Sequence, residues 1–259
     1  MRVAEDAVRE RPPETAAVRI EGATKIFGRG TAAVCALDRV SLTVARGEFL
    51  CILGASGCGK STLLNLIAGL DRTSSGSIVK TGSTTLLFQE AALFPWFTVE
   101  RNVDLALRLR GVPRGERAER VGALLDLVRL REFGDRRPHE LSGGMRQRVA
   151  LARALAQEAT ILLMDEPFGA LDAMTRDLLH EQLERIWEAS DLTVVFVTHN
   201  VREAVRLGDR VVLLTSRPGR VAAEFPIDLQ RPRRIDSPEV AELAATITDQ
   251  LRAEVSRHG

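Results

Sequence analysis

Several features that mark particular classes of protein are missing from the sequence. Its 259 residues contain no tyrosine and only three cysteines. No apolar run approaches the roughly 20 residues that a helix needs to span a bilayer. The cysteines, Cys35, Cys51 and Cys58, are too few and too irregularly spaced for a disulfide framework or a zinc site. These absences argue against a membrane-spanning protein and a disulfide-stabilised secreted domain, and a reducing compartment is expected.

An excess of charge of one sign is also lacking, because 36 basic residues face 35 acidic ones and the net charge is +1. A dedicated nucleic-acid binder usually has a basic surplus on one face, so no nucleic acid is expected as a partner. The first 20 residues are charged and contain proline, without the apolar core of a signal peptide. We therefore expect a protein of the cytosol that can still dock on a membrane protein.

The sequence has the composition and periodicity of an α/β protein. It is 45% hydrophobic and 27% charged, which suits a sizeable buried core. Apolar or alternating runs predict strands within 18–27, 37–54, 161–167, 193–199 and 210–216. Helical spacing predicts helices at 61–70, across most of 91–157 and at 173–190. Strands that alternate with helices indicate a largely parallel sheet covered on both faces.

Both ends of the chain are expected to lie outside the main domain. Residues 1–15 are predicted to be a disordered tail. The stretch 231–238, "RPRRIDSP", predicts a linker with solvated charges. Ser237 and Pro238 are suited to opening a final helix. Its apolar face is predicted to pack against the domain rather than on a membrane, and comprises Val240, Leu243, Ile247, Leu251 and Val255.

A phosphate-binding loop is the strongest motif. The pattern G-x-x-x-x-G-K-S lies between an apolar strand and a helix, which is the context that this motif requires. Its glycines let backbone N–H groups surround a phosphate, and the helix N-terminus adds a partial positive charge. The predicted nucleotide-binding residues are Gly54, Ala55, Ser56, Gly57, Cys58, Gly59, Lys60, Ser61 and, directly after them, Thr62.

Within this loop, Lys60 is expected to bridge the β- and γ-phosphates of ATP, and the Ser61 hydroxyl to ligate Mg²⁺. Cys58 stands at a variable position of the motif. It is either an inert small residue or a thiol whose pKa the anion site lowers.

Two carboxylates end the apolar run "ILLMDE". In P-loop proteins a strand of this kind lies beside the phosphate loop, so Asp165 is predicted to hold Mg²⁺ and Glu166 to activate the attacking water. The alternative is that both carboxylates only cap the following turn. A base supplied by the chain favours an ATP hydrolase over a small-molecule kinase. His199 ends a third strand, where its side chain would face the ligand crevice and contact the γ-phosphate.

Two further residues are ambiguous on their own. Gln89 follows an apolar run and is more often a surface residue than a ligand in such a place. Because the chain lacks tyrosine, Phe27 is the best early aromatic for stacking on adenine, although it could equally belong to the core.

A second exposed helix start occurs far along the chain in "ELSGGMRQR". Ser142 can cap the following helix, and Gly143 and Gly144 leave its N–H groups uncovered. Glycine in an ordinary helix costs about 1 kcal/mol, so a purely structural role is disfavoured. Because the chain already has one phosphate-binding loop, this second surface is predicted to serve the nucleotide of another monomer. Two chains facing head to tail would then enclose two ATP molecules.

In their order along the chain, these motifs resemble those of ATP-binding-cassette (ABC) ATPases, and the "LSGG" element is specific to that family among P-loop proteins. The resemblance covers roughly residues 18–220 and includes Asp172 in "GALDA". It implies an α/β fold: a RecA-like P-loop core, an antiparallel β-subdomain and a helical subdomain at about 91–157. We therefore expect an ATPase domain at 16–220, followed by a linker and C-terminal helix at 221–259.

The resemblance also implies roles. Gln89 becomes the hinge residue that senses the γ-phosphate and Mg²⁺, Phe27 the adenine-stacking aromatic, and His199 the switch histidine. Asp172 lies at the seam of an ATP-bound homodimer, where Ser142 and Gly144 grip the partner's γ-phosphate.

There are three departures from the usual pattern. Met145 follows "LSGG" in place of the common Gln, Asn200 follows the switch histidine in place of Asp, and Ala55 stands where Pro is common. None of these positions supplies an indispensable ligand.

Three further strings resemble the ATPase subunits of bacterial nitrate, sulfonate and taurine importers: "FQEAALFPWFTVERNV", "DEPFGALDAMTR" and "LLTSRPGRV". This implies two transmembrane permease subunits as partners, with a periplasmic or lipid-anchored solute-binding protein acting indirectly. The chain would be peripheral on the cytoplasmic face of the membrane. Phe94 and Trp96 are either a docking anchor for the permease or core residues. Another ABC transporter, including an exporter, and a soluble ABC ATPase remain as alternatives.

Overall fold

The computed structural model describes residues 16–169 and 171–258, so the tail expected at 1–15 lies outside the described residues. A six-stranded sheet has the order β5-β6-β7-β3-β8-β9, and a three-stranded antiparallel sheet has the order β2-β1-β4. The strands are β1 (Ala16–Phe27), β2 (Val34–Ala45), β3 (Phe49–Leu53), β4 (Ser75–Lys80), β5 (Thr84–Leu87), β6 (Ile161–Asp165), β7 (Thr193–Val197), β8 (Arg210–Leu214) and β9 (Val221–Pro226).

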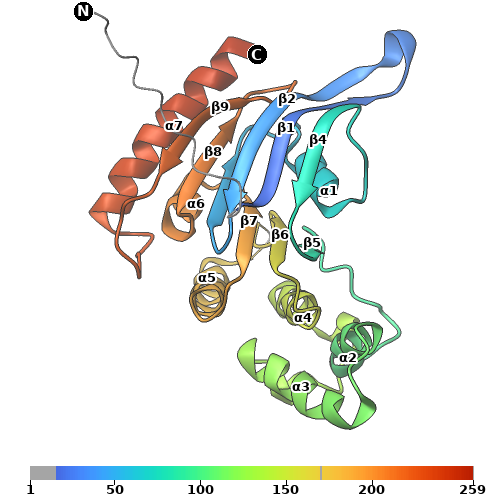
Figure 1. The fold of residues 1–259 in the computed structure, drawn as a ribbon. Coiled ribbons are helices and arrows are strands. Elements are labelled where there is room, and N and C mark those ends of the chain that lie inside the picture. Colours follow the sequence, from blue (N-terminus) through green and yellow to red (C-terminus); the bar gives the residue numbers. More distant parts are fainter. Residues whose placement is uncertain (1–15, 170, 259) are drawn as a thin grey trace, which may run out of the picture.

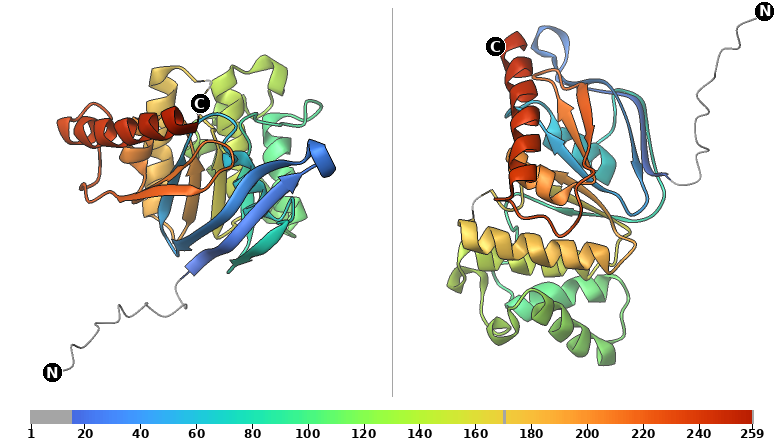
Figure 2. Two further views of the ribbon diagram at one scale, coloured as in Figure 1. Left: turned by 90° about the horizontal axis from the view of Figure 1, so that it is seen from above. Right: turned by 90° about the vertical axis from the view of Figure 1, so that its left-hand side faces the viewer.

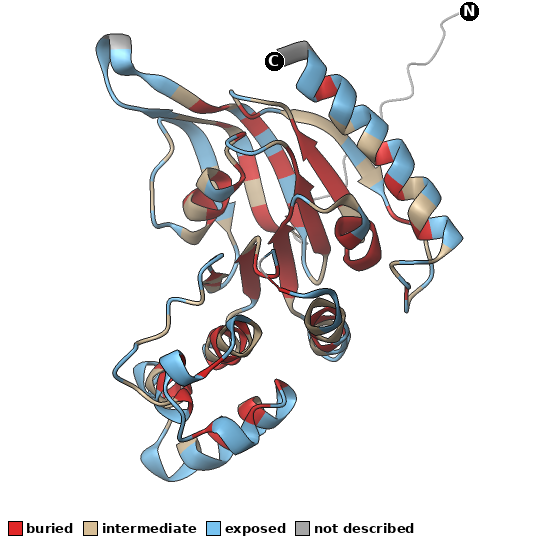
Figure 3. Cartoon of the chain, turned by 180° about the vertical axis from the view of Figure 1, so that it is seen from behind, coloured by how far each residue is buried: buried red, intermediate tan, exposed pale blue. Residues whose placement is uncertain are grey.

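The larger sheet is parallel from β5 to β8, and only its edge strand β9 runs antiparallel. Its central strands are continuous apolar runs, as expected for strands buried on both faces. Every residue of β3 and β7 is buried, and Figure 3 shows the sheet as the most buried part of the molecule. Because parallel strands point the same way, the loops that follow β3, β6, β7 and β8 all lie at the carboxyl ends of the strands.

Alternate residues of β3 face two different cores. Leu50 and Ile52 pack with β1, β2 and α1 (Lys60–Ala68), so this helix lies between the two sheets. Phe49 and Cys51 face the other side, where the sheet is covered by helices. The predicted α/β class, with a P-loop core, an antiparallel β-sheet and a group of helices, is confirmed.

The helices after β5 gather at one end of the molecule, away from the three-stranded sheet (Figures 1 and 2). They are α2 (Val99–Leu109), α3 (Arg114–Leu127) and α4 (Gly143–Leu155). Gly111 and Pro113 separate α2 from α3, and Pro138 opens a short 3-10 turn before α4. Two further helices, α5 (Ala173–Glu188) and α6 (Val201–Leu207), follow β6 and β7.

The C-terminal region differs from the sequence-based expectation in two ways. Strand β9, which was not predicted, pairs with β8 and extends the sheet beyond residue 220. The prediction that the charges of 231–238 are solvated is wrong for two arginines. Arg231 forms ion pairs with Glu184 and Asp209, both at 2.9 Å, and lies over the ring of Trp187.

Arg233 is 6% exposed and satisfies its guanidinium with backbone carbonyls. The acceptors belong to Val205, Arg206, Gly208, Ile227 and Leu229. Of the three arginines between residues 231 and 234, only Arg234 is exposed, and it pairs with Asp236.

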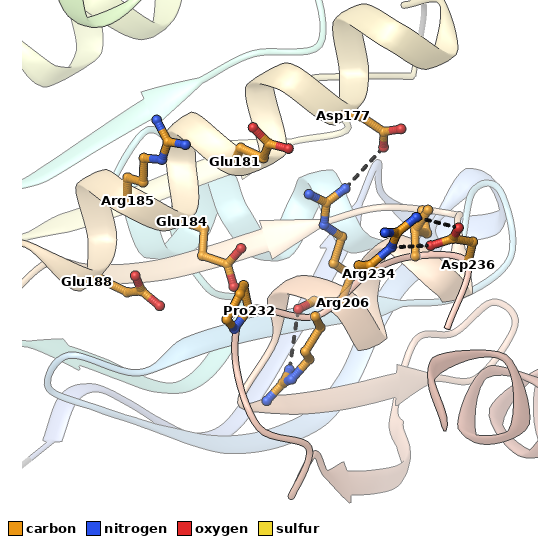
Figure 4. Close-up of a pocket in the computed structure, with 11 residues that line it drawn as sticks. Asp177, Glu181, Glu184, Arg185, Glu188, Arg206, Pro232, Arg234 and Asp236 are labelled. Carbon is orange, nitrogen blue, oxygen red and sulfur yellow. Dashed lines mark hydrogen bonds and ion pairs between the residues drawn. The ribbon is translucent and has the colours of Figure 1, made fainter. Parts of the chain in front are cut away.

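This C-terminal segment borders a charged cleft of about 840 Å³ beside α5. Figure 4 shows Arg206 of α6 reaching Asp177 of α5, at 3.0 Å, while Arg234 turns to Asp236. The segment is fastened to α5 by the ion pair of Arg231 with Glu184, and to α6 by the hydrogen bonds of Arg233 to backbone carbonyls, before the last helix begins.

The last helix, α7 (Pro238–His258), begins as predicted, because the Val240 N–H donates to the Ser237 hydroxyl. Val240 and Ile247 are buried against the domain, whereas Val255 at the far end is 42% exposed. The predicted apolar face thus packs over most of its length, with Val255 as the exception. Among the described residues no helix combines the length and apolarity required to cross a bilayer.

Candidate functional site

The phosphate-binding loop connects β3 to α1 and lies at the carboxyl end of β3. The first helical residue is Lys60, and no side chain caps this helix start, so its N–H groups stay available to a ligand. Gly59 has a φ of 102°. A Cβ there would lie 2.7 Å from Leu37 Cδ2 and 2.8 Å from the Ala36 carbonyl oxygen, so only glycine fits. The backbone of Gly54–Ser61 thus forms an open loop, called the cradle below, of the kind that a polyphosphate requires.

Three ionisable side chains meet beside this cradle. Glu166 Oε2 lies 2.8 Å from His199 Nδ1, and Glu166 Oε1 lies 3.7 Å from Lys60 Nζ. Lys60 is 5% exposed, and its Nζ donates to the carbonyls of Gly54 and Ala55. The carboxylate therefore stands between two cationic or potentially cationic groups. The fold brings together Lys60 at the start of α1, Glu166 directly after β6 and His199 shortly after β7.

Glu166 has an unusual backbone conformation. Its φ is 43°, in the left-handed region that residues with a Cβ adopt rarely. The Glu166 N–H donates to the Val197 carbonyl at 2.9 Å, and the Glu166 carbonyl accepts from the Gly169 N–H at 3.2 Å. These hydrogen bonds fix the residue at the end of β6. Backbone strain of this kind concentrates at active sites.

Asp165 and Ser61 have the chemistry of a divalent-cation site. Burial raises the pKa of Asp165, and a hydrogen bond with the Ser61 hydroxyl offsets part of that rise. A carboxylate and a hydroxyl are ligands that Mg²⁺ accepts, and its remaining positions are commonly filled by water and substrate phosphates. A cation here would favour the charged form of the buried Asp165. The two residues therefore fit the predicted metal.

A pocket of about 380 Å³ is lined by Lys60, Ser61 and Glu166 of these groups. Phe27 lines it and is 44% exposed, with Lys25 Nζ 4.9 Å from the ring centroid, so Phe27 is not a core residue. Gln89 also lines it, and its backbone carbonyl accepts a hydrogen bond from the Gln147 side chain. The full lining is Phe27, Val34, Ala36, Ser56, Gly57, Gly59, Lys60, Ser61, Thr62, Gln89, Glu166 and Arg217.

The "LSGG" element is not part of this pocket. Ser142 caps α4 by accepting from the Met145 N–H at 3.2 Å, and the first two residues of α4, Gly143 and Gly144, have no side chain. A Cβ on Gly144 would lie 2.7 Å from Thr175 Cγ2 of α5. Asp172 caps α5 in the same manner, and its hydrogen bond from the Thr175 N–H lowers the pKa of the Asp172 carboxyl. Both helix starts thus lie outside the pocket that contains Lys60.

The Cys58 thiol is buried, at 1% exposure, and this burial raises its pKa. Of the two interpretations of Cys58, the structure therefore favours the inert small residue. A Cβ on Gly54 would lie 2.6 Å from Cys58 Sγ, which shows how closely the thiol packs under the loop.

Sequence reasoning missed two features of the site. Arg217, on the loop after β8, lines the nucleotide pocket. The loop that carries His199 is held by buried Glu203, which accepts hydrogen bonds from the Thr198 hydroxyl and contacts His180 Nε2 at 2.6 Å. The sequence did offer one signal for Arg217. It is a cationic residue that closely follows β8, whose carboxyl end lies on the same side of the sheet as the phosphate-binding loop. No local pattern links Glu203 to His180, which lies 23 residues earlier.

A glycine-rich loop between a strand and an uncapped helix, with an acidic pair at the end of a second parallel strand of the same sheet, defines a P-loop nucleoside triphosphatase. Comparison with known proteins places the chain within that class. The ABC transporter family profile matches residues 37–169. The chain therefore belongs to the ABC transporter family, as an ATP-binding subunit that hydrolyses ATP to drive transport.

Individual relatives agree with this assignment. An uncharacterized ABC transporter ATP-binding protein of Methanocaldococcus jannaschii is 46% identical over 97% of each chain. An aliphatic sulfonates import ATP-binding protein of Burkholderia lata is 46% identical over 96% of this chain and 77% of its own length. A nitrate import ATP-binding protein of Synechocystis is 44% identical over 82% of this chain and 83% of its own.

Among solved structures, the fold is similar to a dimeric ATP-binding cassette in a post-hydrolysis state bound to ADP and Pi. The TM-score is 0.74 and the sequence identity 34%. The match covers 82% of this chain and 100% of that one.

Proposed function

We propose that the chain powers an importer of a small anionic solute such as nitrate, an aliphatic sulfonate or taurine. The observation that carries this proposal is the similarity, at 44–46% identity, to relatives named as nitrate and aliphatic sulfonate import ATP-binding proteins. The strings "FQEAALFPWFTVERNV" and "LLTSRPGRV" support it. Two transmembrane permease subunits would form the channel, a periplasmic or lipid-anchored protein would deliver the solute, and this chain would work at the cytoplasmic face of the membrane.

ATP hydrolysis is proposed to occur in a homodimer. The cradle, Lys60 and Glu166 come from one copy, and the glycine-rich start of α4, with its capping residue Ser142, comes from the other. Support comes from the position of the two phosphate-binding surfaces, which do not share a pocket within one chain. The cassette solved with ADP and Pi is itself dimeric. Asp172, which caps α5 beside Gly144, would then lie at the seam between the copies.

Within each site, Glu166 is proposed to accept the proton of the attacking water. His199, 2.8 Å from that carboxylate, would orient it and contact the γ-phosphate, while Lys60 would exchange its carbonyl partners for phosphate oxygens. Phe27 would stack on adenine, and Thr62 would donate its N–H to the phosphate tail. Ser61, Asp165 and Gln89 would hold Mg²⁺, which neutralises phosphate charge when bound.

The permease is proposed to dock beside the nucleotide hinge at Gln89. Trp96 is 65% exposed and packs against Phe94, with ring centroids 5.7 Å apart. Phe94 also lines a groove of about 540 Å³ between α2, α4 and the end of β5. Exposed aromatic side chains beside an apolar groove are typical of an interaction site. The groove would receive a short helix, which moves when the dimer closes on ATP.

Solubilised membranes from the source cell test this function. The tagged chain should co-purify with a multi-span permease, and the reconstituted complex should hydrolyse ATP faster when a solute-binding protein presents its anion. Transport of nitrate, a sulfonate or taurine into vesicles would identify the solute. Purification without any membrane protein, or stimulation only by a cationic or apolar solute, would contradict the proposal.

A further inference from the structure

The loop between β8 and β9 brings a cation to the nucleotide pocket. Arg217 lies on this loop with an exposed side chain and lines the same pocket as Phe27 and Lys60. Its Nε donates to the Gly57 carbonyl at 3.4 Å, and a Cβ on Gly57 would lie 3.6 Å from Arg217 Nη2. The guanidinium therefore touches the part of the cradle whose backbone is open to phosphate.

This loop is fixed against the cradle rather than free to swing. The Gly219 N–H donates to the Ala36 carbonyl at 2.9 Å, and the Gly219 carbonyl accepts from the Asp38 N–H at 3.0 Å. A Cβ on Gly219 would lie 2.2 Å from the Cys58 carbonyl oxygen, so only glycine allows this close approach. The Thr215 hydroxyl donates to the Pro218 carbonyl and closes the turn. The position of Arg217 is thus set by the fold.

The two arginines of this loop differ in their charge partners. Arg220 forms an ion pair with Asp38. In residues 16–169 and 171–258 no carboxylate pairs with Arg217, whose hydrogen bond to Gly57 leaves other donors of the guanidinium unused. A phosphate group offers several charged acceptors, which a guanidinium binds well.

We propose that Arg217 is a further nucleotide-binding residue, which contacts the phosphate tail of the ATP held by its own chain. Its place against Gly57 favours the phosphates over adenine, which the exposed Phe27 ring serves. The contact adds binding energy and charge attraction without taking part in proton transfer, because the water-activating group is Glu166. This inference rests on the proposed assignment of the cradle as the ATP site.

The test measures dissociation constants by calorimetry for a non-hydrolysable ATP analogue, ADP and adenosine. Arg217→Gln should weaken the binding of the ATP analogue by about three- to tenfold and leave adenosine binding unchanged. Arg217→Lys, which keeps the charge, should recover part of the loss. Arg220→Gln on the same loop should match the wild type. The salt dependence of ATP binding should also become shallower in Arg217→Gln, because one charge contact is lost.

Unchanged ATP binding in Arg217→Gln would overturn the inference. An equal loss for adenosine, or an equal effect of Arg220→Gln, would also overturn it, because each outcome would assign the effect to the shape of the loop. Lys60→Ala separates this inference from the site assignment. If Lys60→Ala abolishes ATP binding while Arg217→Gln has no effect, only the role of Arg217 fails. If Lys60→Ala binds ATP normally, the proposed ATP site fails as well.

Discussion

The left-handed backbone of Glu166 leads to a stability prediction that separates strain from side-chain contacts. Replacing Glu166 by Ala or by Gly removes the same contacts with Lys60 and His199, so the two variants differ only by a Cβ. A Cβ in this region costs about 1–2 kcal/mol, and the greater freedom of unfolded glycine offsets about 0.5–1 kcal/mol of that difference. Glu166→Gly should therefore be the more stable variant, by about 0.5–1 kcal/mol.

In thermal unfolding this difference corresponds to about 1–4 °C in Tm for a chain of this size. Neither variant should hydrolyse ATP at an appreciable rate. Glu181, exposed within α5, provides the matched control. At that helical position the order should reverse, with Ala more stable than Gly by about 1 kcal/mol. Equal stability of the two Glu166 variants, or the same order as at Glu181, would show that Glu166 carries no backbone strain.

Three other predictions concern the C-terminal segment, the cradle thiol and the docking surface. Arg233→Met should lower the free energy of unfolding by about 2–4 kcal/mol in a denaturant titration, because several buried carbonyls lose their donor, whereas exposed Arg234→Met should change it by less than about 0.5 kcal/mol. Cys58 should resist alkylation in the native protein as the pH rises towards 9, because its raised pKa keeps the thiol neutral; Cys35, only partly buried, should react first, and mass spectrometry of labelled peptides checks the order. Trp96→Ala should leave ATP binding by the isolated chain unchanged but reduce its co-purification with the permease; retention of the whole complex would argue against this surface.

The local motifs of this protein could be predicted because their chemistry is contiguous in sequence. The cradle from Gly54 to Ser61 needs its own strand and helix, and both are adjacent. The helix caps at Ser142 and Asp172 likewise depend on residues three positions away. Strands β3, β6, β7 and β8 were predictable because their continuous apolar runs are typical of a buried parallel sheet.

The features that were missed depend on contacts between distant parts of the chain. Arg231 is charged and follows an unpredicted strand, so its stretch was interpreted as a solvated linker. Its partners Glu184 and Asp209 lie 47 and 22 residues earlier, which no local pattern could reveal. Arg217 reaches the nucleotide pocket only because the β8–β9 loop docks against a cradle 160 residues earlier. The hydrogen-bond and ion-pair partners of these arginines are therefore determined by the tertiary structure and not by the local sequence.

Mixing two inactive variants tests the shared ATP site most directly. Lys60→Ala removes a cradle lysine, and Ser142→Arg blocks the start of α4. In a mixed dimer, one site combines the intact cradle of the Ser142→Arg chain with the intact α4 start of the Lys60→Ala chain. With random pairing in a two-fold dimer, the mixture should regain up to about a quarter of the wild-type ATPase rate, although each variant alone is inactive. No recovery in proven mixed dimers, or full hydrolysis by a strictly monomeric wild-type chain, would contradict the account.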